Sequence, residues 1–289
     1  MRAPFAIVGA GKVGTALARL LARAGWEFVG AGSRSIDSAR AACATAGSGT
    51  ATTQPAEVTR AAHLVLITTP DDAIAGVCAA IVAENGVRAG AIVAHCSGAL
   101  GSDVLAPARA AGASVGSMHP LQTFPTAEQA LASLPGSFYA IEGDPEAVAL
   151  LRDVVDALGG RPLAISAEGK PLYHAAAVLS NNYLVALQHA AVELMGAAGI
   201  SRADALPALM PLIRGSIAAL DEVGLPGCLT GPISRGDRDT VRRHLDAIAA
   251  HAPDLLALYK TLGRHAVEVA LAKGTLAPPA AGELRDMLA

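Results

Sequence analysis

Aromatic residues are scarce in this 289-residue chain, which has four Phe, four Tyr and one Trp. Charged residues are also few, at 16%, whereas hydrophobic residues make up 52%. This balance is typical of a packed globular protein and argues against a disordered chain. Because aromatics are so few, Ala, Val, Leu and Ile must form most of the core. The length allows one large domain or two of ordinary size.

Paired cysteines and dense runs of positive charge are lacking too. The four cysteines stand far apart and show neither a CxxC pair nor the spacing of metal ligands: Cys43, Cys78, Cys96 and Cys228. Scattered single thiols suit a reducing compartment. With a net charge of −3 and no Lys/Arg run, the chain has no footprint for nucleic acid. We therefore expect no metal site and no nucleic-acid partner.

The sequence predicts neither a signal peptide nor a membrane span. The apolar run at 5–8 leads directly into a glycine loop, which a signal peptide does not do. The uncharged stretch at 175–192 is interrupted by polar residues such as Asn181 and Gln188. It is therefore interpreted as a buried helix with a polar stripe. We expect a cytoplasmic protein without a membrane partner.

The first 165 residues alternate short β-rich runs with helical patterns, which is typical of βαβ units in a parallel sheet. Strands are expected at 5–8, 26–31, 63–68, 91–95, 113–117, 138–141 and 162–165, with a weaker one at 50–52. Helices are expected between them at 12–24, 35–46, 71–83 and 146–158, and after Ser166 at 168–197, 201–222, 237–250 and 253–273. The predicted class is α/β: a Rossmann domain with a doubly wound, mostly parallel sheet at 1–165, and an all-α domain at 166–289.

The segment GAGKVG has the G-x-G-x-x-G spacing of a dinucleotide-binding loop, with Gly9, Gly11 and Gly14 as its glycines. A strand precedes it and an amphipathic helix follows, which is the context that gives the motif meaning. Gly9 allows the tight turn, Gly11 allows a pyrophosphate to approach, and Gly14 allows close helix packing. The helix then begins with Lys12 and Val13, so its N–H groups face the phosphates.

The end of the second strand indicates which dinucleotide binds. An NAD site usually places a carboxylate there to bind the ribose 2′-hydroxyl. Here the tip is Ser33, Arg34 and Ser35, and no carboxylate comes before Asp37. An arginine between hydroxyls suits a 2′-phosphate. We predict NADP(H), the alternative being that Arg34 is only a solvated surface residue.

The nicotinamide end is expected beyond the fourth and fifth strands, because ligands of doubly wound sheets lie past the carboxyl ends of the strands. Thr68, Thr69 and Pro70 are predicted to line the nicotinamide ribose. Asp71 or Asp72 is expected to cap the next helix.

The next strand ends contribute further candidates. Ser97 is predicted to contact the cofactor, the alternative being an ordinary turn hydroxyl. His95 falls inside an apolar strand and is interpreted as a hydrogen-bonded core histidine. His119 lies in a proline-bounded loop, SMHPLQTFP, and either contacts the substrate or fixes the loop.

A polar stripe marks the first helix of the second domain. At 100° per residue, Lys170, His174, Asn181 and Gln188 fall within a sector of about 40° on an otherwise apolar helix. Carbonyl reduction needs a proton for the developing alkoxide, which His174 or Lys170 can supply while Asn181 orients the carbonyl. Histidine is the better donor by its ordinary pKa, and Tyr173 is a weaker candidate. The alternative is a stripe that supports an interdomain contact without chemistry.

The segment LTGPISRGD forms a second polar cluster, and its glycines and proline predict a shaped loop. Ser234 and Arg235 are predicted to bind substrate, because a guanidinium can clamp a carboxylate with two hydrogen bonds. The alternative for Arg235 is an ion pair with Asp237 or Asp239 at the start of the next helix.

Together, GAGKVG, GSRS, TTPDDAI, HCSGALG, MHPLQTFP, the helix from Lys170 and LTGPISRGD resemble the family that joins a Rossmann-like domain to a DUF2520 domain. That family is related to 6-phosphogluconate dehydrogenase-like proteins and to ketopantoate and pyrroline-5-carboxylate reductases. The resemblance implies NADPH as cofactor and a helical domain for substrate binding and homodimer formation. In related enzymes a Lys and an Asn project from the long helix. This chain has His174 where such a Lys is expected, with Lys170 one turn earlier.

Three functional hypotheses follow. The first is an NADPH-dependent reductase of a small 2-oxo acid, with ketopantoate as the leading candidate. The second is a reductase of a cyclic imine such as pyrroline-5-carboxylate. The third, from another class, is an NADP(H)-binding sensor without turnover. The stripe of polar groups in an apolar helix favours an enzyme over a sensor.

Overall fold

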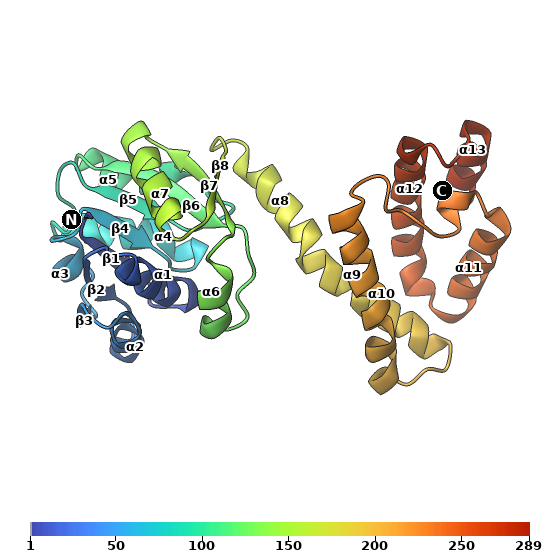
Figure 1. The fold of residues 1–289 in the computed structure, drawn as a ribbon, viewed down its shortest axis with the longest axis horizontal. Coiled ribbons are helices and arrows are strands. Elements are labelled where there is room, and N and C mark those ends of the chain that lie inside the picture. The colour runs from blue at the N-terminus through green and yellow to red at the C-terminus, as the bar shows by residue number, and fades with distance from the viewer. Residues whose placement is uncertain (1) are drawn as a thin grey trace. The chain divides into compact units, whose positions relative to one another are not determined.

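The computed structural model describes residues 2–289 (Figure 1). By their internal contacts the residues form two compact units, Met1–Asn181 and Asn182–Ala289. The helix α8 (Lys170–Ser180), which follows the last strand, belongs by contacts to the first unit. The domain boundary placed at residue 165 from the sequence stays a prediction.

The first unit is built on one eight-stranded sheet in the order β3-β2-β1-β4-β5-β6-β7-β8. Its strands are β1 (Phe5–Val8), β2 (Phe28–Gly32), β3 (Thr50–Thr52), β4 (Leu64–Ile67), β5 (Ile92–His95), β6 (Ser114–Pro120), β7 (Phe138–Gly143) and β8 (Arg161–Ala164). Every neighbouring pair is parallel except β6 and β7. The predicted doubly wound, mostly parallel Rossmann sheet is confirmed, including its weak third strand.

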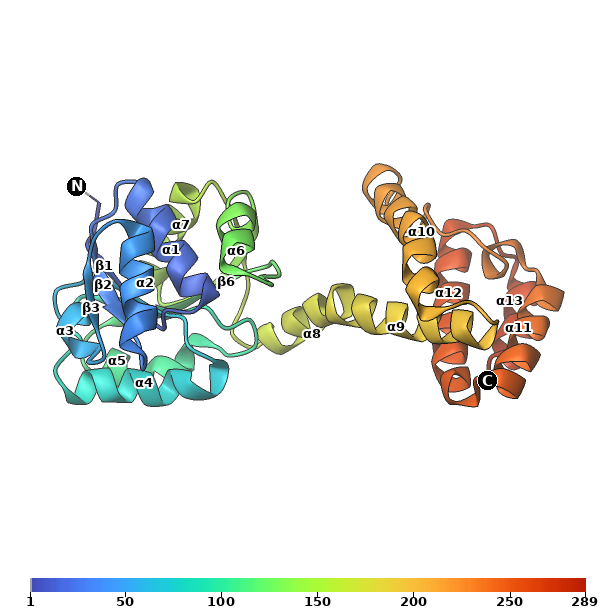
Figure 2. The ribbon, with the colours of Figure 1, turned by 90° about the horizontal axis from the view of Figure 1, so that it is seen from below.

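Helices cover both faces of this sheet. One face packs against α1 (Lys12–Arg23), α2 (Ile36–Ala46), α6 (Ala127–Ser133) and α7 (Pro145–Ala157). The other packs against α3 (Ala56–Thr59), α4 (Asp71–Ala83), the 3₁₀ turn η1 (Ser102–Leu105) and α5 (Ala106–Ala110). The two helical layers are seen on either side of the sheet in Figure 2. In β1, Phe5 and Ile7 enter one core while Ala6 and Val8 enter the other, which explains the unbroken apolar run of this central strand.

The second unit is all-helical, with no strand among its residues 182–289, which confirms the predicted all-α region. It comprises α9 (Asn182–Ala197), α10 (Arg202–Glu222), η2 (Ile233–Arg235), α11 (Arg238–His251), η3 (Pro253–Leu255), α12 (Leu256–Lys273) and α13 (Pro278–Met287). Its core brings together Val241 of α11, Val267 of α12 and Leu284 of α13. Asp237 caps α11, accepting a hydrogen bond from the Thr240 N–H at 3.0 Å.

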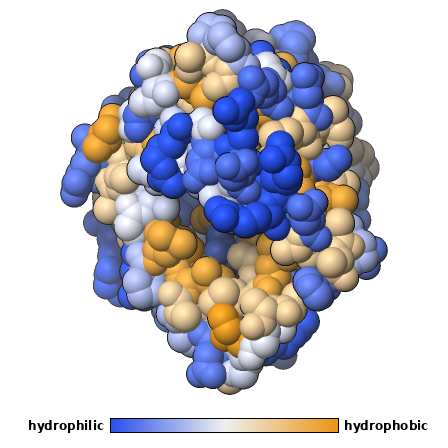
Figure 3. Space-filling model, turned by 90° about the vertical axis from the view of Figure 1, so that its right-hand side faces the viewer, coloured by the Kyte–Doolittle hydropathy of each residue, from blue (hydrophilic) through white to orange (hydrophobic). Residues whose placement is uncertain are grey.

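Large apolar side chains remain exposed on α9 and α10. Val185 is 68% exposed, Leu212 69% and Ile217 52%. On the side drawn in Figure 3, hydrophilic residues gather in the upper half and largely apolar ones border a hollow below them. By length and composition alone α10 could cross a membrane, the one such helix in the part of the chain that the structure describes. An exposed apolar face of this kind is also what a protein interface requires.

The predicted continuous helix at 168–197 is wrong, because α8 and α9 are separate helices that break at Asn181. Asn181 has φ −113° and ψ −63°, outside regular helix geometry. Two consecutive asparagines favour such a break, since their side chains compete for backbone hydrogen bonds.

Candidate functional site

The glycine loop between β1 and α1 is shaped as a dinucleotide-binding loop requires. Gly9 has φ +106°, which glycine adopts without strain. A Cβ on Gly14 would lie 2.2 Å from the Gly9 carbonyl oxygen and 2.4 Å from Thr68 Oγ1, whereas one on Gly11 would meet nothing within 4 Å. The space before Gly11 is therefore open at the point where a pyrophosphate would approach the N-terminus of α1.

The start of α1 leaves its N–H groups available to such an anion. Gly11 is the N-cap, no side chain caps the helix, and its first turn has no acidic residue. Lys12 is exposed and Val13 half-buried, so both stand at the mouth of the loop. Unpaired N–H groups and the positive end of the helix dipole attract phosphate oxygens.

The tip of β2 offers an unpaired cation. The Ser33 N–H donates to the Thr52 carbonyl, and the Ser35 hydroxyl caps α2 by accepting from the Ser38 N–H at 3.3 Å. Arg34 is exposed and makes no ion pair or hydrogen bond within residues 2–289. The nearest acid in sequence, Asp37, pairs with Arg40 instead. A guanidinium held at this tip suits a 2′-phosphate.

The end of β4 lies against this loop. Thr68 Oγ1 donates to the Gly9 carbonyl at 2.6 Å, so the threonine holds the glycine loop in place. The Thr69 hydroxyl is buried and has no partner within the described residues. A buried polar atom without a partner is uncommon and marks a position where a bound group can complete the hydrogen bond. Pro70, which precedes α4, is exposed.

The Ser97 hydroxyl orders the turn after β5. Its Oγ donates to Asp71 Oδ2 at 2.8 Å and accepts from the N–H groups of Ala99 and Leu100 at 3.2 and 3.1 Å. Capping of α4 by Asp71 or Asp72 is not observed, because the N-cap is Pro70 and no side chain caps the helix. The Asp71 carboxylate instead accepts a hydrogen bond from the Ser97 hydroxyl. Contact between Ser97 and the cofactor stays a prediction.

His95 is the hydrogen-bonded core histidine that its strand position predicts. It is fully buried, Nδ1 accepts from the Ser97 N–H at 3.1 Å, and Nε2 donates to the Gly101 carbonyl at 3.1 Å. Burial, followed by the charge of Lys170, lowers the pKa of His95 to about 4. His95 is therefore neutral at physiological pH.

His119 lies on β6 opposite Ala140, not in a loop as predicted. The strand extends to Pro120 because the antiparallel partner β7 supplies a hydrogen-bonding edge that the sequence pattern did not reveal. His119 Nδ1 is 2.8 Å from the Tyr173 hydroxyl oxygen, with the rings edge to face. Burial first, then the charges of Lys170 and His174, lower the pKa of His119 to about 4.

His174 stands beside this pair, its ring centroid 6.3 Å from that of His119. Both imidazoles border Gly98, where a Cβ would lie 2.8 Å from His119 Nε2 and 2.8 Å from His174 Cδ2. The turn after β5, the end of β6 and the second turn of α8 therefore meet at one place. Burial raises the pKa of Tyr173 to about 12, so its phenol stays protonated at neutral pH.

Lys170, predicted as an alternative proton donor, is fully buried. Its Nζ donates to the Ser97 carbonyl at 2.8 Å and to Ser117 Oγ, and lies 3.8 Å from Glu142 Oε1. Asn181 is exposed at the end of α8, two turns beyond His174. Sequence reasoning missed Glu142 and underrated Tyr173, whose partners come from distant strands.

The LTGPISRGD loop belongs to the second unit. Ser234 is 5% exposed, and its hydroxyl bonds Thr275 Oγ1 at 3.1 Å and the Leu229 carbonyl at 3.4 Å, so it stiffens the loop. Arg235 is exposed and makes no ion pair among residues 2–289. The alternative pairing of Arg235 with Asp237 or Asp239 is therefore not observed.

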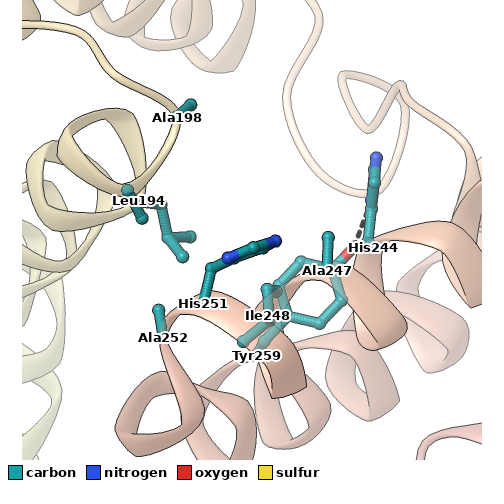
Figure 4. Close-up of a pocket in the computed structure, with 9 residues that line it drawn as sticks. Leu194, Ala198, His244, Ala247, Ile248, His251, Ala252 and Tyr259 are labelled. Carbon is teal, nitrogen blue, oxygen red and sulfur yellow. Dashed lines mark hydrogen bonds between the residues drawn. The ribbon is translucent and has the colours of Figure 1, made fainter.

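A largely apolar pocket of about 350 Å³ lies within the second unit (Figure 4). Leu194 and Ala198 line one side, and His244, His251 and Tyr259 the other. His244 Nδ1 and the Tyr259 hydroxyl bond each other at 2.7 Å. No Lys, Arg, Asp or Glu lines this pocket, so it offers no charged group for a nucleotide or a carboxylate.

Comparison with protein families finds two matches. A Rossmann-like domain model matches residues 1–120, and the domain of unknown function DUF2520 matches residues 137–266. A search of curated proteins finds no match.

Solved structures share the fold over most of the chain. BF3122 from Bacteroides fragilis, described as a "putative NADP oxidoreductase", is 27% identical, with a TM-score of 0.72 over 92% of this chain and 98% of its own. TM1727 from Thermotoga maritima is 25% identical, with a TM-score of 0.75 over 93% and 99%. An imine reductase from Pseudomonas sp. is 19% identical, with a TM-score of 0.62 over 93% and 96%, and shares the fold.

Proposed function

We propose that this chain, which belongs to the proteins joining a Rossmann-like domain to a DUF2520 domain, is an NADPH-dependent reductase of a small carbonyl compound. Similarity to BF3122 supports the cofactor and the oxidoreductase class. The observation that carries the proposal is the meeting of His119, Tyr173 and His174 at the carboxyl edge of the sheet that also forms the dinucleotide loop. That edge is where doubly wound sheets bind their ligands.

The residues of the loop fit NADP(H). Gly9, Gly11 and Gly14 leave room for the pyrophosphate, and Arg34 is an unpaired cation for the 2′-phosphate. The buried, unpartnered Thr69 hydroxyl is available to the nicotinamide ribose. When bound, the cofactor supplies the hydride. The protein then has to supply a proton to the oxygen of the substrate.

Tyr173 is the group best placed to deliver that proton. Its phenol is protonated at neutral pH, since burial raises its pKa to about 12. Neutral His119 can donate its Nδ1–H to the phenolic oxygen, which leaves the Tyr173 proton free for the substrate and stabilises the phenolate that results. An imine can arrive already protonated, so its reduction needs no proton from the protein, whereas the alkoxide formed from a carbonyl does. A protonated phenol at this position therefore favours a carbonyl over an imine substrate.

His174 completes the site as the second polar group facing the substrate, next to His119. Lys170 is not proposed as the donor, because two of its N–H groups are bonded and it is fully buried. For the substrate we propose a small 2-oxo acid, with ketopantoate as the leading candidate. Its support is the resemblance to the family that joins a Rossmann-like domain to a DUF2520 domain, which is related to ketopantoate reductases.

The test is steady-state oxidation of NADPH with ketopantoate and, in parallel, pyrroline-5-carboxylate. We expect turnover with ketopantoate and a loss of about 10-fold or more in kcat/KM for both Tyr173→Phe and His174→Ala. Unchanged turnover in both variants would remove the proposed roles of these residues. Turnover with the imine alone would replace the carbonyl by an imine substrate. Tight NADPH binding with no turnover on either compound would identify a sensor.

We also propose that the protein forms a homodimer through the exposed apolar faces of α9 and α10. Val185, Leu212 and Ile217 are each more than half exposed, and apolar faces of this extent are unusual on a monomer. Sedimentation equilibrium is expected to give twice the mass of a single chain. Leu212→Glu is expected to shift this equilibrium towards the monomer, because it places a charge on the apolar face. A parental protein that sediments with the mass of a single chain at micromolar concentration would overturn the proposal.

A further inference from the structure

Lys170 is unusual among the charged residues of this chain because its side chain is fully buried. It stands at the first position of α8. Its ammonium group donates to the Ser97 carbonyl at 2.8 Å and to Ser117 Oγ. Ser97 follows β5 and Ser117 lies on β6, so a single side chain joins the start of α8 to two adjacent strand ends. Burying a cation is costly, and this one keeps two hydrogen bonds and faces a carboxylate.

The carboxylate of Glu142 on β7 balances the positive charge of Lys170. Its carboxylate is 5% exposed, and Oε1 lies 3.8 Å from Lys170 Nζ. Oε1 also accepts from the Ser102 N–H at 2.9 Å, and Oε2 accepts from the Ser102 hydroxyl at 2.8 Å. The carboxylate is therefore held from one side by η1 and faces the ammonium on the other. A buried ion pair with its remaining hydrogen bonds made imposes one arrangement on the segments that it joins.

The segments joined are the two walls of the proposed catalytic site. Tyr173 and His174 follow Lys170 by three and four residues, so they lie above it on the same side of α8. The Ser97 carbonyl that Lys170 binds immediately precedes Gly98, the residue that His119 and His174 both contact. A shift of α8 or of this turn would separate the Tyr173 hydroxyl from His119.

The charge of Lys170 also acts on His119. After burial, it is the largest cause of the lowered pKa of His119. His174 and His95 act in the same direction, while Asp71 opposes them. Burial lowers the pKa of Lys170 itself, but the nearby Glu142 carboxylate opposes this shift. Removing the positive charge is therefore expected to raise the pKa of His119.

We propose that Lys170 is a positioning residue of this site, which with Glu142 seats α8 against the turn after β5 and against β6. It does not pass a proton to the substrate. The inference rests on the proposed reductase function for its kinetic consequences, but its structural and protonation consequences are independent of turnover.

The test uses the double variant Lys170→Met/Glu142→Gln, because Lys170→Met alone leaves a buried carboxylate unpaired and is at risk of not folding. The double change removes both charges at nearly constant volume. Arg152→Met is the matched control, since it removes one positive charge from an exposed position of α7 in the same unit. Protein NMR of the imidazole Cε1 proton gives the pKa of His119 in each protein without any substrate.

In the double variant we expect the pKa of His119 to rise by about one unit and the acid limb of the kcat profile to rise with it. The sign follows from the requirement for neutral His119, so the parent keeps activity down to pH values near its pKa of about 4. We expect kcat at neutral pH to fall about 10- to 100-fold through loss of alignment, and the Kd for NADPH to change less than about threefold. The control should match the parent in every measurement.

Two results would overturn the proposal. One is a folded double variant whose His119 pKa and kcat equal those of the parent. The other is loss of turnover that added alkylamines restore with an unchanged His119 pKa, which would make Lys170 a proton donor. Failure of the proposed function is separate, because it shows as absence of turnover in the parent while the NMR titration still decides whether Lys170 controls His119.

Discussion

Tyr173→Phe is expected to lower kcat for the carbonyl substrate by about 10²- to 10⁴-fold, the range typical of losing a positioned general acid. Among residues 2–289 the phenol is the one side chain that hydrogen-bonds the His119 ring, at 2.8 Å, and it stays protonated with a pKa of about 12. Phenylalanine keeps the ring and its packing on His119 but removes the proton. The Kd for NADPH should stay within about twofold of the parental value, because the hydroxyl that is removed acts on the substrate in the transition state and not on the bound cofactor.

Stopped-flow measurement of single-turnover NADPH oxidation isolates the chemical step in this variant. Tyr183→Phe provides the matched control, since Tyr183 is 58% exposed on α9 and is expected to keep parental rates. A Tyr173→Phe enzyme that retains more than half of the parental rate would move the donor role to His174. Loss of NADPH binding along with kcat would instead indicate that Tyr173 supports the cofactor.

Gly14→Ala is expected to weaken NADPH binding strongly and to destabilise the first unit. The added Cβ would lie 2.2 Å from the Gly9 carbonyl oxygen and 2.4 Å from Thr68 Oγ1, far inside contact distance. Since the Gly9 oxygen is backbone, either α1 moves away from β1 or the loop opens and the 2.6 Å bond from Thr68 to Gly9 is lost. We expect a loss of about 1–3 kcal/mol in the free energy of unfolding. The Kd for NADPH should rise by at least about 100-fold.

Gly11→Ala distinguishes weaker NADPH binding caused by a distorted loop from weaker NADPH binding caused by a blocked pyrophosphate site. A Cβ on Gly11 would meet no atom of the protein within 4 Å, so the free energy of unfolding should remain within about 0.5 kcal/mol of the parent. Its methyl group would nevertheless stand where the pyrophosphate approaches, and NADPH binding should weaken. Fluorescence titration with NADPH and urea unfolding of both variants make the comparison. Parental NADPH affinity in Gly14→Ala would exclude this loop as the dinucleotide site.

Local signals in the sequence were sufficient for the sheet of the first unit. The run Phe5–Val8 has no polar residue because both faces of β1 are covered, and GAGKVG follows it at once. Such signals depend on neighbours within a few residues, so they can be recognised before the chain is folded. The family match over residues 1–120 and 137–266 agrees with the motifs that suggested it.

Predictions that needed distant partners were weaker. The prolines on either side of His119 predict a loop. The structure instead extends β6 through His119, because β7 pairs Ala140 with it. The continuous apolar pattern at 168–197 predicts one helix, but the structure has two, because the helix is interrupted at Asn181. The helices α3, α5, α6 and α13 were not predicted, since the first three are short and α13 begins with two prolines.

The sequence by itself therefore determined the Rossmann sheet and predicted the dinucleotide loop and NADP(H), all from signals in contiguous residues. Only the tertiary structure decided what the polar stripe of α8 does. In the folded protein Lys170 is buried against Ser97 and Glu142, and Tyr173 contacts His119, which lies 54 residues away in the chain. The physical reason is that strand order sets which distant residues meet, and burial then decides which of them keep a charge.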